Sequence, residues 1–157
     1  MKRAVVYYSL SENTKEAARI IAEKLGADIY RIHTKKKMPK SFASQIMFGG
    51  MQACFGLKPA ITDVPENLFE YDEIILGTPI WAGKHSPAIN TLIHKYHIEN
   101  KVVAVFTLSG GGDNNQCIPV LEKLLPNMKC NVALADKNND KASENEALIV
   151  SFIEKLQ

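Results

Sequence analysis

The sequence has no hydrophobic run long enough to cross a membrane and no strong excess of charge of either sign. Its 19 Lys and Arg residues against 17 Asp and Glu residues give a formal net charge of +2. That charge is too small to argue for binding to nucleic acid or to an anionic membrane. The N-terminus also has no apolar stretch typical of a signal peptide. These absences predict a cytoplasmic protein without a membrane segment.

Cysteine is scarce as well. The three cysteines, Cys54, Cys117 and Cys130, are odd in number and have no CxxC spacing. The sequence therefore suggests neither a disulfide framework nor a zinc site. The histidines likewise show no shared spacing typical of a metal site. We expect reduced cysteines, as in cytoplasmic proteins, and no bound metal.

The chain of 157 residues, 46% of them apolar, is long enough for one domain with a full hydrophobic core. Apolar and β-branched runs predict strands, which are separated by stretches of helical periodicity. The strands are expected at residues 3–8, 27–33, 73–78, 101–109 and 130–135. This alternation predicts an α/β fold, in which helices cover both faces of a parallel sheet within a single domain over residues 1–157.

The predicted helices have recognisable ends. Asn13 and Glu16 suggest a capping box for a helix that runs to Leu25 and stops at Gly26. Ser86 is expected to cap the next helix, with Pro87 in its first turn. Two further helices are expected at about 115–125 and from Ser143, the latter burying four apolar positions. These are Ile149, Phe152, Ile153 and Leu156.

Residues 34–72 are irregular, apart from one stripe of apolar residues. Ile46, Met47, Met51, Cys54 and Phe55 keep a helical spacing across Gly49-Gly50. The stripe predicts one loose helix followed by a loop. Packing in the hydrophobic core is the favoured interpretation of this stripe, and contact with a cofactor is the alternative.

The ends of three predicted strands are unusual. Ligands of open parallel sheets bind outside the carboxyl ends of the strands, so these ends are the candidate site. The first loop consists of Ser9, Leu10, Ser11, Glu12, Asn13 and Thr14. The second consists of Thr78, Pro79, Ile80, Trp81, Ala82 and Gly83, and the third of Ser109, Gly110, Gly111, Gly112 and Asp113.

Each loop has a functional and a structural interpretation. Hydroxyls at a helix N-terminus can hold a phosphate by hydrogen bonds without a cation among them, although Ser and Asn are also ordinary helix caps. Glycines after a strand allow a flat ligand to approach the backbone, or simply form a turn. Trp81 can stack on an aromatic ring or belong to the core. Together, the loops predict a site for a phosphorylated planar ring.

At these loops the sequence resembles the flavodoxins over nearly its whole length. YYSLSENTKEAA resembles their phosphate loop, LGTPIWAGKHSP their Trp-bearing flavin loop, and TLSGGGDN their glycine-rich loop ending in Asp. The likeness is strongest to small bacterial flavodoxin-like proteins that carry a GGMQA stretch. It implies a three-layer, doubly wound sandwich whose five-stranded parallel sheet has the order 2-1-3-4-5. It implies FMN as the cofactor, bound by the residues of the three loops, and no catalytic side chains.

The sequence departs from the flavodoxin pattern in three respects. Glu12 stands where the family often has Gly, and we expect its carboxylate to point to solvent. The glycine-rich loop lacks the tyrosine that commonly covers the second flavin face. The chain is slightly basic, whereas typical flavodoxins are strongly acidic. The resemblance thus implies electron transfer to a redox partner protein. The alternative is an FMN-dependent reductase of the NAD(P)H/quinone type, which would oxidise NAD(P)H and reduce small acceptors.

The sequence lacks the residues that three other protein classes would need at these loops. The first loop has neither the Cys and Arg of a phosphatase-like site nor the Gly-Lys-Ser/Thr of a P-loop. A receiver domain would need an Asp where Thr78 stands. His85 could relay a proton to a reduced flavin, but a surface histidine before a helix cap is the favoured interpretation. Cys117 is interpreted as a small buried helix residue rather than a cofactor contact.

Overall fold

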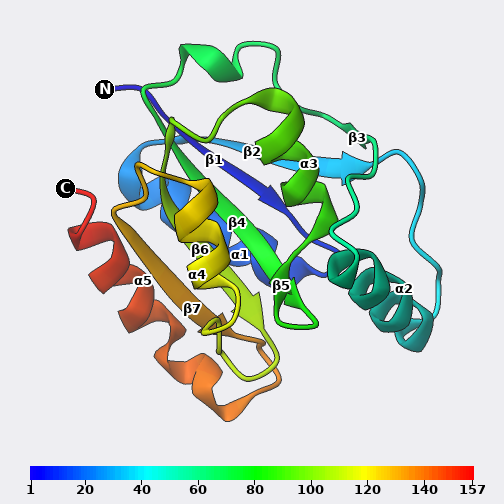
Figure 1. The fold of residues 1–157 in the computed structure, drawn as a ribbon. Coiled ribbons are helices and arrows are strands. Elements are labelled where there is room, and N and C mark those ends of the chain that lie inside the picture. The colour runs from blue at the N-terminus through cyan, green and yellow to red at the C-terminus, as the bar shows by residue number, and fades with distance from the viewer.

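The central strands of the sheet are the most apolar segments of the chain. β1 (Arg3–Tyr8), β4 (Glu73–Trp81) and β6 (Val102–Ser109) are buried along most of their length. Strands of this kind need helices on both faces of a parallel sheet. In the computed structural model, which describes residues 1–157, these strands run side by side through the middle of the molecule (Figure 1).

The parallel strands lie in the order β2-β1-β4-β6-β7, where β2 is Asp28–Thr34 and β7 is Cys130–Ala135. Numbered along the chain, this is the predicted order 2-1-3-4-5, so the doubly wound fold class is confirmed. Two short antiparallel strands were not predicted, and they bring the sheet to seven strands. β3 (Ile61–Thr62) pairs with β2 at the edge, and β5 (Lys84–His85) pairs with the end of β4.

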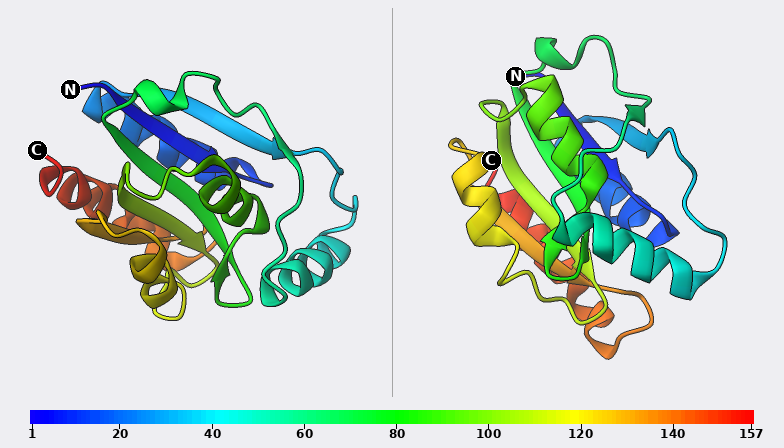
Figure 2. Two further views of the ribbon diagram at one scale, coloured as in Figure 1. Left: turned by 45° about the horizontal axis from the view of Figure 1, so that its top comes forward. Right: turned by 45° about the vertical axis from the view of Figure 1, so that its right-hand side comes forward.

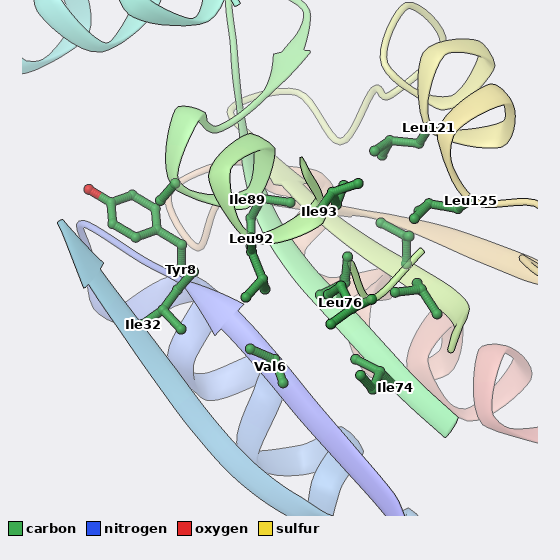
Figure 3. Packing of buried hydrophobic residues seen from close by; sticks show 14 of the residues in the cluster. Val6, Tyr8, Ile32, Ile74, Leu76, Ile89, Leu92, Ile93, Leu121 and Leu125 are labelled. Atoms are coloured by element: carbon green, nitrogen blue, oxygen red, sulfur yellow. The ribbon is translucent and has the colours of Figure 1, made fainter. Parts of the chain in front are cut away.

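Four helices cover the two faces of the sheet (Figure 2). α1 (Glu12–Leu25) and α5 (Asn145–Glu154) pack on one face, and α3 (Pro87–Tyr96) and α4 (Ile118–Leu124) on the other. Figure 3 shows the second of these cores, where side chains from the strands meet those of α3 and α4. The residues labelled there are Val6, Tyr8, Ile32, Ile74, Leu76, Ile89, Leu92, Ile93, Leu121 and Leu125. None of the helices has the length and apolar character needed to cross a membrane.

The start of α1 differs from the prediction. The helix begins at Glu12, so Asn13 and Glu16 lie inside it and form no capping box; Glu16 instead pairs with Arg19 at 2.7 Å. Ser11 is the N-cap residue, but its side chain makes no capping hydrogen bond. Gly26 ends the helix with a left-handed backbone (φ 60°), as predicted.

The later helices agree with the prediction in place but not in every boundary. Ser86 and Pro87 stand at the N-cap and first turn of α3. The last helix is preceded by a 3₁₀ turn, η2 (Asp140–Glu144), so α5 starts after Ser143. Another 3₁₀ turn, η1 (Leu68–Glu70), precedes β4. The four apolar positions predicted to be buried near the C-terminus are buried.

The prediction that the Met/Phe stripe packs in the core is wrong. The stripe lies on α2 (Phe42–Cys54), which runs without a break across Gly49-Gly50. The buried residues of α2 are Gly49 and Ala53, whereas Met47 and Phe55 are 72% and 74% exposed. Small residues on the inner side let the helix approach the sheet closely. The large apolar side chains consequently face outward.

A group of charged residues joins the chain ends to the sheet at the edge opposite the candidate loops. Glu73, at the start of β4, is 8% exposed and accepts hydrogen bonds of 2.8 Å from Arg3 Nε and Lys129 Nζ. Arg3 also donates to the carbonyl oxygen of Leu156 at 2.7 Å. Burial alone would raise the pKa of Glu73, but the hydrogen bonds from Lys129 and Arg3 outweigh it, so this pKa is lowered.

Glu73→Gln should therefore lower the free energy of unfolding by about 3 kcal/mol at pH 7, because it leaves the buried Arg3 without its anionic partner. Since the folded pKa of Glu73 lies below its ordinary value of 4.5, this stabilisation is complete above that pH. It is lost as the pH falls through the folded pKa. Urea unfolding of both proteins at pH 7 and at lower pH measures the difference.

Glu70→Gln is the matched control, because Glu70 forms an exposed pair with Lys2 at 3.6 Å. It should change the free energy of unfolding by less than about 0.5 kcal/mol. Equal losses in the two variants would contradict the structural role given to Glu73.

Candidate functional site

The three candidate loops meet at one edge of the sheet because the strands before them are parallel neighbours. β1 pairs with β4 up to Tyr7 and Gly77, and β4 pairs with β6 up to Pro79 and Leu108. The chain leaves all three strands at the same end (Figure 2). The strand order of the fold therefore brings together residues that are far apart in the sequence.

The first loop presents an uncapped helix N-terminus. Ser11 has an extended backbone (φ −108°, ψ 173°), and its hydroxyl makes no capping bond, so the first N–H groups of α1 are not satisfied by its side chain. Ser9 and Thr14 are buried, while Ser11 and Glu12 are exposed. Helix N–H groups and nearby hydroxyls form a setting that suits an anion.

Arg31 lies beside this loop and was missed by the sequence analysis. It comes from β2, where it stands opposite Tyr7 of β1. Its Nη2 donates to the carbonyl oxygen of Ser9 at 2.8 Å, and its buried Nε has no hydrogen-bond partner. We expected hydrogen bonds alone at this loop, without a counter-cation, but the neighbouring strand places a cation beside it. Strand order was the signal that could have pointed to Arg31.

The Glu12 carboxylate is turned toward solvent, in agreement with the expectation. Its side chain is 65% exposed and accepts a hydrogen bond from Lys15 Nζ at 2.6 Å, with Arg31 Nη1 at 3.6 Å. The hydrogen bond from Lys15 is the main reason why the pKa of Glu12 is lowered. The negative charge closest to the helix N-terminus is thus paired with two cations.

The second loop is a β-hairpin rather than an open loop. β4 continues past the predicted end at Thr78 through Trp81, turns at Ala82 and Gly83, and returns as β5. Both turn residues have positive φ (49° and 73°), as in a type I′ hairpin turn. Thr78 is buried, and its Oγ1 accepts a hydrogen bond from Ser86 N at 2.9 Å. Its side chain therefore fixes the start of α3.

Trp81 is half-buried between two elements. Its ring makes an edge contact with Tyr8 of β1, with centroids 5.8 Å apart and planes at 83°. On α2, a Cβ atom at Gly49 would come within 2.8 Å of Trp81 Cε3. Gly49 is therefore required for the close approach of α2 to the tryptophan. α2 is a fourth element of this edge, which the sequence analysis did not place there.

The third loop is closed by Ser109 and Asp113. Ser109 Oγ accepts from Asp113 N at 3.0 Å, and Asp113 Oδ1 accepts from Asn115 N at 2.8 Å. Gly112 has a φ of 68°, and a Cβ there would lie 3.3 Å from the Cβ of Ala135. Gly110 and Gly111 are exposed and would meet no atom within 4 Å. Their backbone is open to a flat molecule.

The hairpin and the third loop enclose a cavity of about 190 Å³. Its lining residues are Ile80, Gly83, Asp113, Asn114, Asn115 and Gln116. A larger cavity of about 650 Å³ lies between α1 and α5 and includes Glu12 and Asn13, but it does not reach the hairpin. The structure thus joins the second and third loops in one cavity. The first loop is linked to the second through the Tyr8–Trp81 contact.

His85, on the returning strand of the hairpin, and Cys117 line a common cavity. His85 is 9% exposed, so its interpretation as a surface histidine is wrong; its Nε2 lies 3.3 Å from Asn90 Oδ1. Burial lowers the pKa of His85. Cys117 is buried as predicted, and burial raises the pKa of its thiol to about 11, which makes it a poor nucleophile.

The flavodoxin family model matches residues 2–154. The chain belongs to the flavodoxin family. No curated protein matches this flavodoxin-family chain in sequence.

Solved structures share the fold over nearly the whole chain. A candidate flavoprotein from Bacteroides eggerthii is 26% identical, with a TM-score of 0.72 over 96% of this chain and 97% of its own. A flavoprotein from Lactobacillus acidophilus, solved in complex with FMN, is 21% identical, with a TM-score of 0.70 over 94% and 97% of the two chains. A candidate flavoprotein from Bacteroides uniformis is 25% identical, with a TM-score of 0.69 over 87% and 93%.

Gly112 and Gly110 of the third loop differ in backbone conformation, and two variants test this difference. Gly112→Ala should lower the free energy of unfolding by about 1–2 kcal/mol, because a side chain is strained at positive φ. Gly110→Ala should leave it unchanged or raise it by about 0.5 kcal/mol, since its backbone lies outside the left-handed region. Urea unfolding of both variants measures the difference. If Gly110→Ala also lowered the free energy of unfolding, the space beside Gly110 would not be open in the folded protein.

Proposed function

We propose that this flavodoxin-family protein binds FMN without a covalent bond at the three loops and transfers electrons through it. The observation that carries this proposal is the first loop. An uncapped helix N-terminus, the exposed Ser11 hydroxyl and the unpartnered Nε of Arg31 converge there. Such donors fit a phosphate group.

The other two loops fit the ring system of FMN. Trp81 is a half-buried aromatic side chain on the hairpin, whose residues Ile80 and Gly83 line the cavity. The open backbone of Gly110 and Gly111 allows a flat ring to approach. The side chains of Thr78 and Ser109 are engaged in hydrogen bonds of their own loops, so these residues would contact the ring mainly through their backbone. The FMN bound by the Lactobacillus acidophilus flavoprotein supports the same choice of cofactor here.

When bound, FMN supplies the redox chemistry, and the protein supplies its position and surroundings. Arg31 and the α1 N-terminus would hold the phosphate. Glu12 stays paired with Lys15 and points away from the anion. Tyr8 and α2 hold the Trp81 ring at the site. In this proposal no side chain needs to act as an acid, base or nucleophile.

The phosphate and ring sites can be separated by two variants of the protein freed of FMN. Ser11→Ala should weaken FMN binding by about 1.5–3 kcal/mol, because a hydrogen bond to a charged group is lost, and should hardly change riboflavin binding. Gly110→Ala should weaken both ligands equally, because its methyl group occupies the space of the ring. Quenching of flavin fluorescence gives both dissociation constants.

Ser151→Ala is the control, because it removes an exposed hydroxyl from α5, outside the three loops. It should change neither affinity. If Ser11→Ala weakened riboflavin as much as FMN, the first loop would not be the phosphate site.

A second candidate function is reduction of small acceptors such as quinones at the expense of NAD(P)H. The exposed Gly110–Gly111 backbone favours it, because the third loop has no aromatic side chain that would cover the second face of the ring. A redox partner protein is the alternative acceptor. We place either reaction in the cytoplasm.

Steady-state oxidation of NAD(P)H by the FMN-loaded protein distinguishes these acceptors. We expect NAD(P)H and quinone to be converted to NAD(P)⁺ and hydroquinone in equal amounts, without a second protein. If turnover appeared only after a reductase protein was added, the chain would be a dedicated electron carrier.

A further inference from the structure

α2 exposes its large apolar side chains instead of burying them. A surface helix normally directs its apolar face to the core and its polar face to water. Here Gly49 and Ala53 face the sheet, and Met47 and Met51 lie on the opposite side of the helix. Phe42 and Ile46 share the side of Gly49 and Ala53 by helical spacing, yet both are exposed. Together with Phe55 and Leu57, which follow the helix, these exposed residues form what we term the α2 face. Its members and their exposed fractions are Phe42 (77%), Ile46 (59%), Met47 (72%), Met51 (52%), Phe55 (74%) and Leu57 (46%).

Such a face is not explained by the fold. Single exposed apolar residues are normal on soluble proteins, but a contiguous group of them marks an interaction site. α2 contacts β4, β5 and α3 through its inner side, and its outer side projects at the periphery of the molecule (Figures 1 and 2). Another surface is therefore needed to remove these side chains from water.

The charge around α2 has one sign. Residues 29–62 contain six basic residues and no acidic one, whereas the rest of the chain contains 13 basic and 17 acidic residues. The overall net charge of +2 conceals this separation. Lys35, Lys36, Lys37 and Lys40 precede the helix, and Lys58 follows it; all five are exposed. Exposed lysines thus lie in the chain segments on both sides of the apolar α2 face.

This combination favours a lipid surface over a protein. In a symmetric dimer the same patch would face itself, and the lysines of the two copies would repel each other. Protein interfaces are enriched in phenylalanine and methionine but depleted in lysine. The exposed lysines on both sides of α2 therefore argue against a protein partner. Exposed apolar side chains next to a cluster of lysines are typical of segments that bind an anionic bilayer.

We propose that α2 docks the protein on the surface of an anionic membrane, with the α2 face among the acyl chains and the lysines at the phosphates. This inference does not depend on FMN. If the proposed function also holds, docking has a consequence, because Gly49 on the inner side of α2 contacts Trp81. The redox site would then lie about one helix diameter, roughly 10 Å, from the lipid, within reach of lipid-dissolved acceptors.

The exposed Cys54 on α2 allows a direct test, because Cys117 and Cys130 are buried. The full-length protein is labelled at Cys54 with a polarity-sensitive fluorophore and mixed with vesicles of phosphatidylcholine alone or with about 30% phosphatidylglycerol. We expect a blue shift of the label and at least tenfold stronger partitioning to the anionic vesicles. Salt should weaken the partitioning because it screens the lysine–phosphate attraction.

Two variants address the two components of the surface. Changing Lys35, Lys36 and Lys37 together to Gln should weaken partitioning about a hundredfold, roughly fivefold for each lysine. Changing Phe42, Met47 and Phe55 together to Ser should weaken it at least tenfold and abolish the blue shift, because the inserted apolar area is lost. Sedimentation with the vesicles measures partitioning, and thermal unfolding verifies that each variant is folded.

Matched controls remove the same groups elsewhere. Lys123, Lys137 and Lys141 are exposed and are changed to Gln in one control; Leu148 and Val150 on α5 are exposed and are changed to Ser in the other. Both controls should leave partitioning unchanged. Equal losses in the control and the α2 variants would overturn the proposal, as would the absence of partitioning. Dimerisation that buries the label without lipid would assign the α2 face to a second copy. Binding to polyglutamate that depends on the lysines, without binding to vesicles, would assign it to an acidic protein.

Discussion

The parallel register of β1, β4 and β6 is the constraint on which the rest of the molecule depends. Because these strands are buried on both faces, their backbone groups must pair with one another, and the helices between them must cover the sheet. The three strands consequently end at the same edge. A hydroxyl-rich loop, a tryptophan hairpin and a glycine loop become neighbours there, although they lie 26 to 95 residues apart along the chain. The site is a result of the topology and not of any local segment.

Sequence patterns were sufficient wherever one physical cause dominated. The apolar runs of the inner strands, the Gly26 stop and the Ser86–Pro87 start predicted the inner strands and most helices correctly. The strand order came from the resemblance to the flavodoxins. Sequence patterns were insufficient where a residue depends on a neighbour from another element. Arg31 reaches the first loop only because β2 lies beside β1. The side of α2 that faces the sheet is the side of Gly49, because only a glycine allows the close approach to the Trp81 ring. The apolar spacing of the α2 sequence alone did not show this.

The two ends of the sheet have different roles. At one end, Glu73, Arg3 and Lys129 join β1, β4 and the segment before β7, and Arg3 also holds the carbonyl of Leu156. At the other end, the loops carry exposed glycines, an uncapped helix and a half-buried tryptophan. Polar groups at the first end are satisfied by partners within the chain, whereas at the second end Arg31 Nε has no partner and the Ser11 side chain makes no cap hydrogen bond. The stabilising charges and the proposed binding site therefore lie at opposite edges of one sheet.

The uncapped start of α1 links these roles. A side-chain cap on this helix would contribute about 1 kcal/mol to the folded protein, yet the hydroxyl of Ser11 makes no such bond. The free protein gives up that stabilisation and keeps its N–H groups open. An anion that occupies them restores the missing hydrogen bonds. Because it binds the native state and not the unfolded one, it stabilises the protein by mass action. Cellular levels of the protein would then follow the supply of its ligand, since molecules without it unfold more often and are degraded sooner.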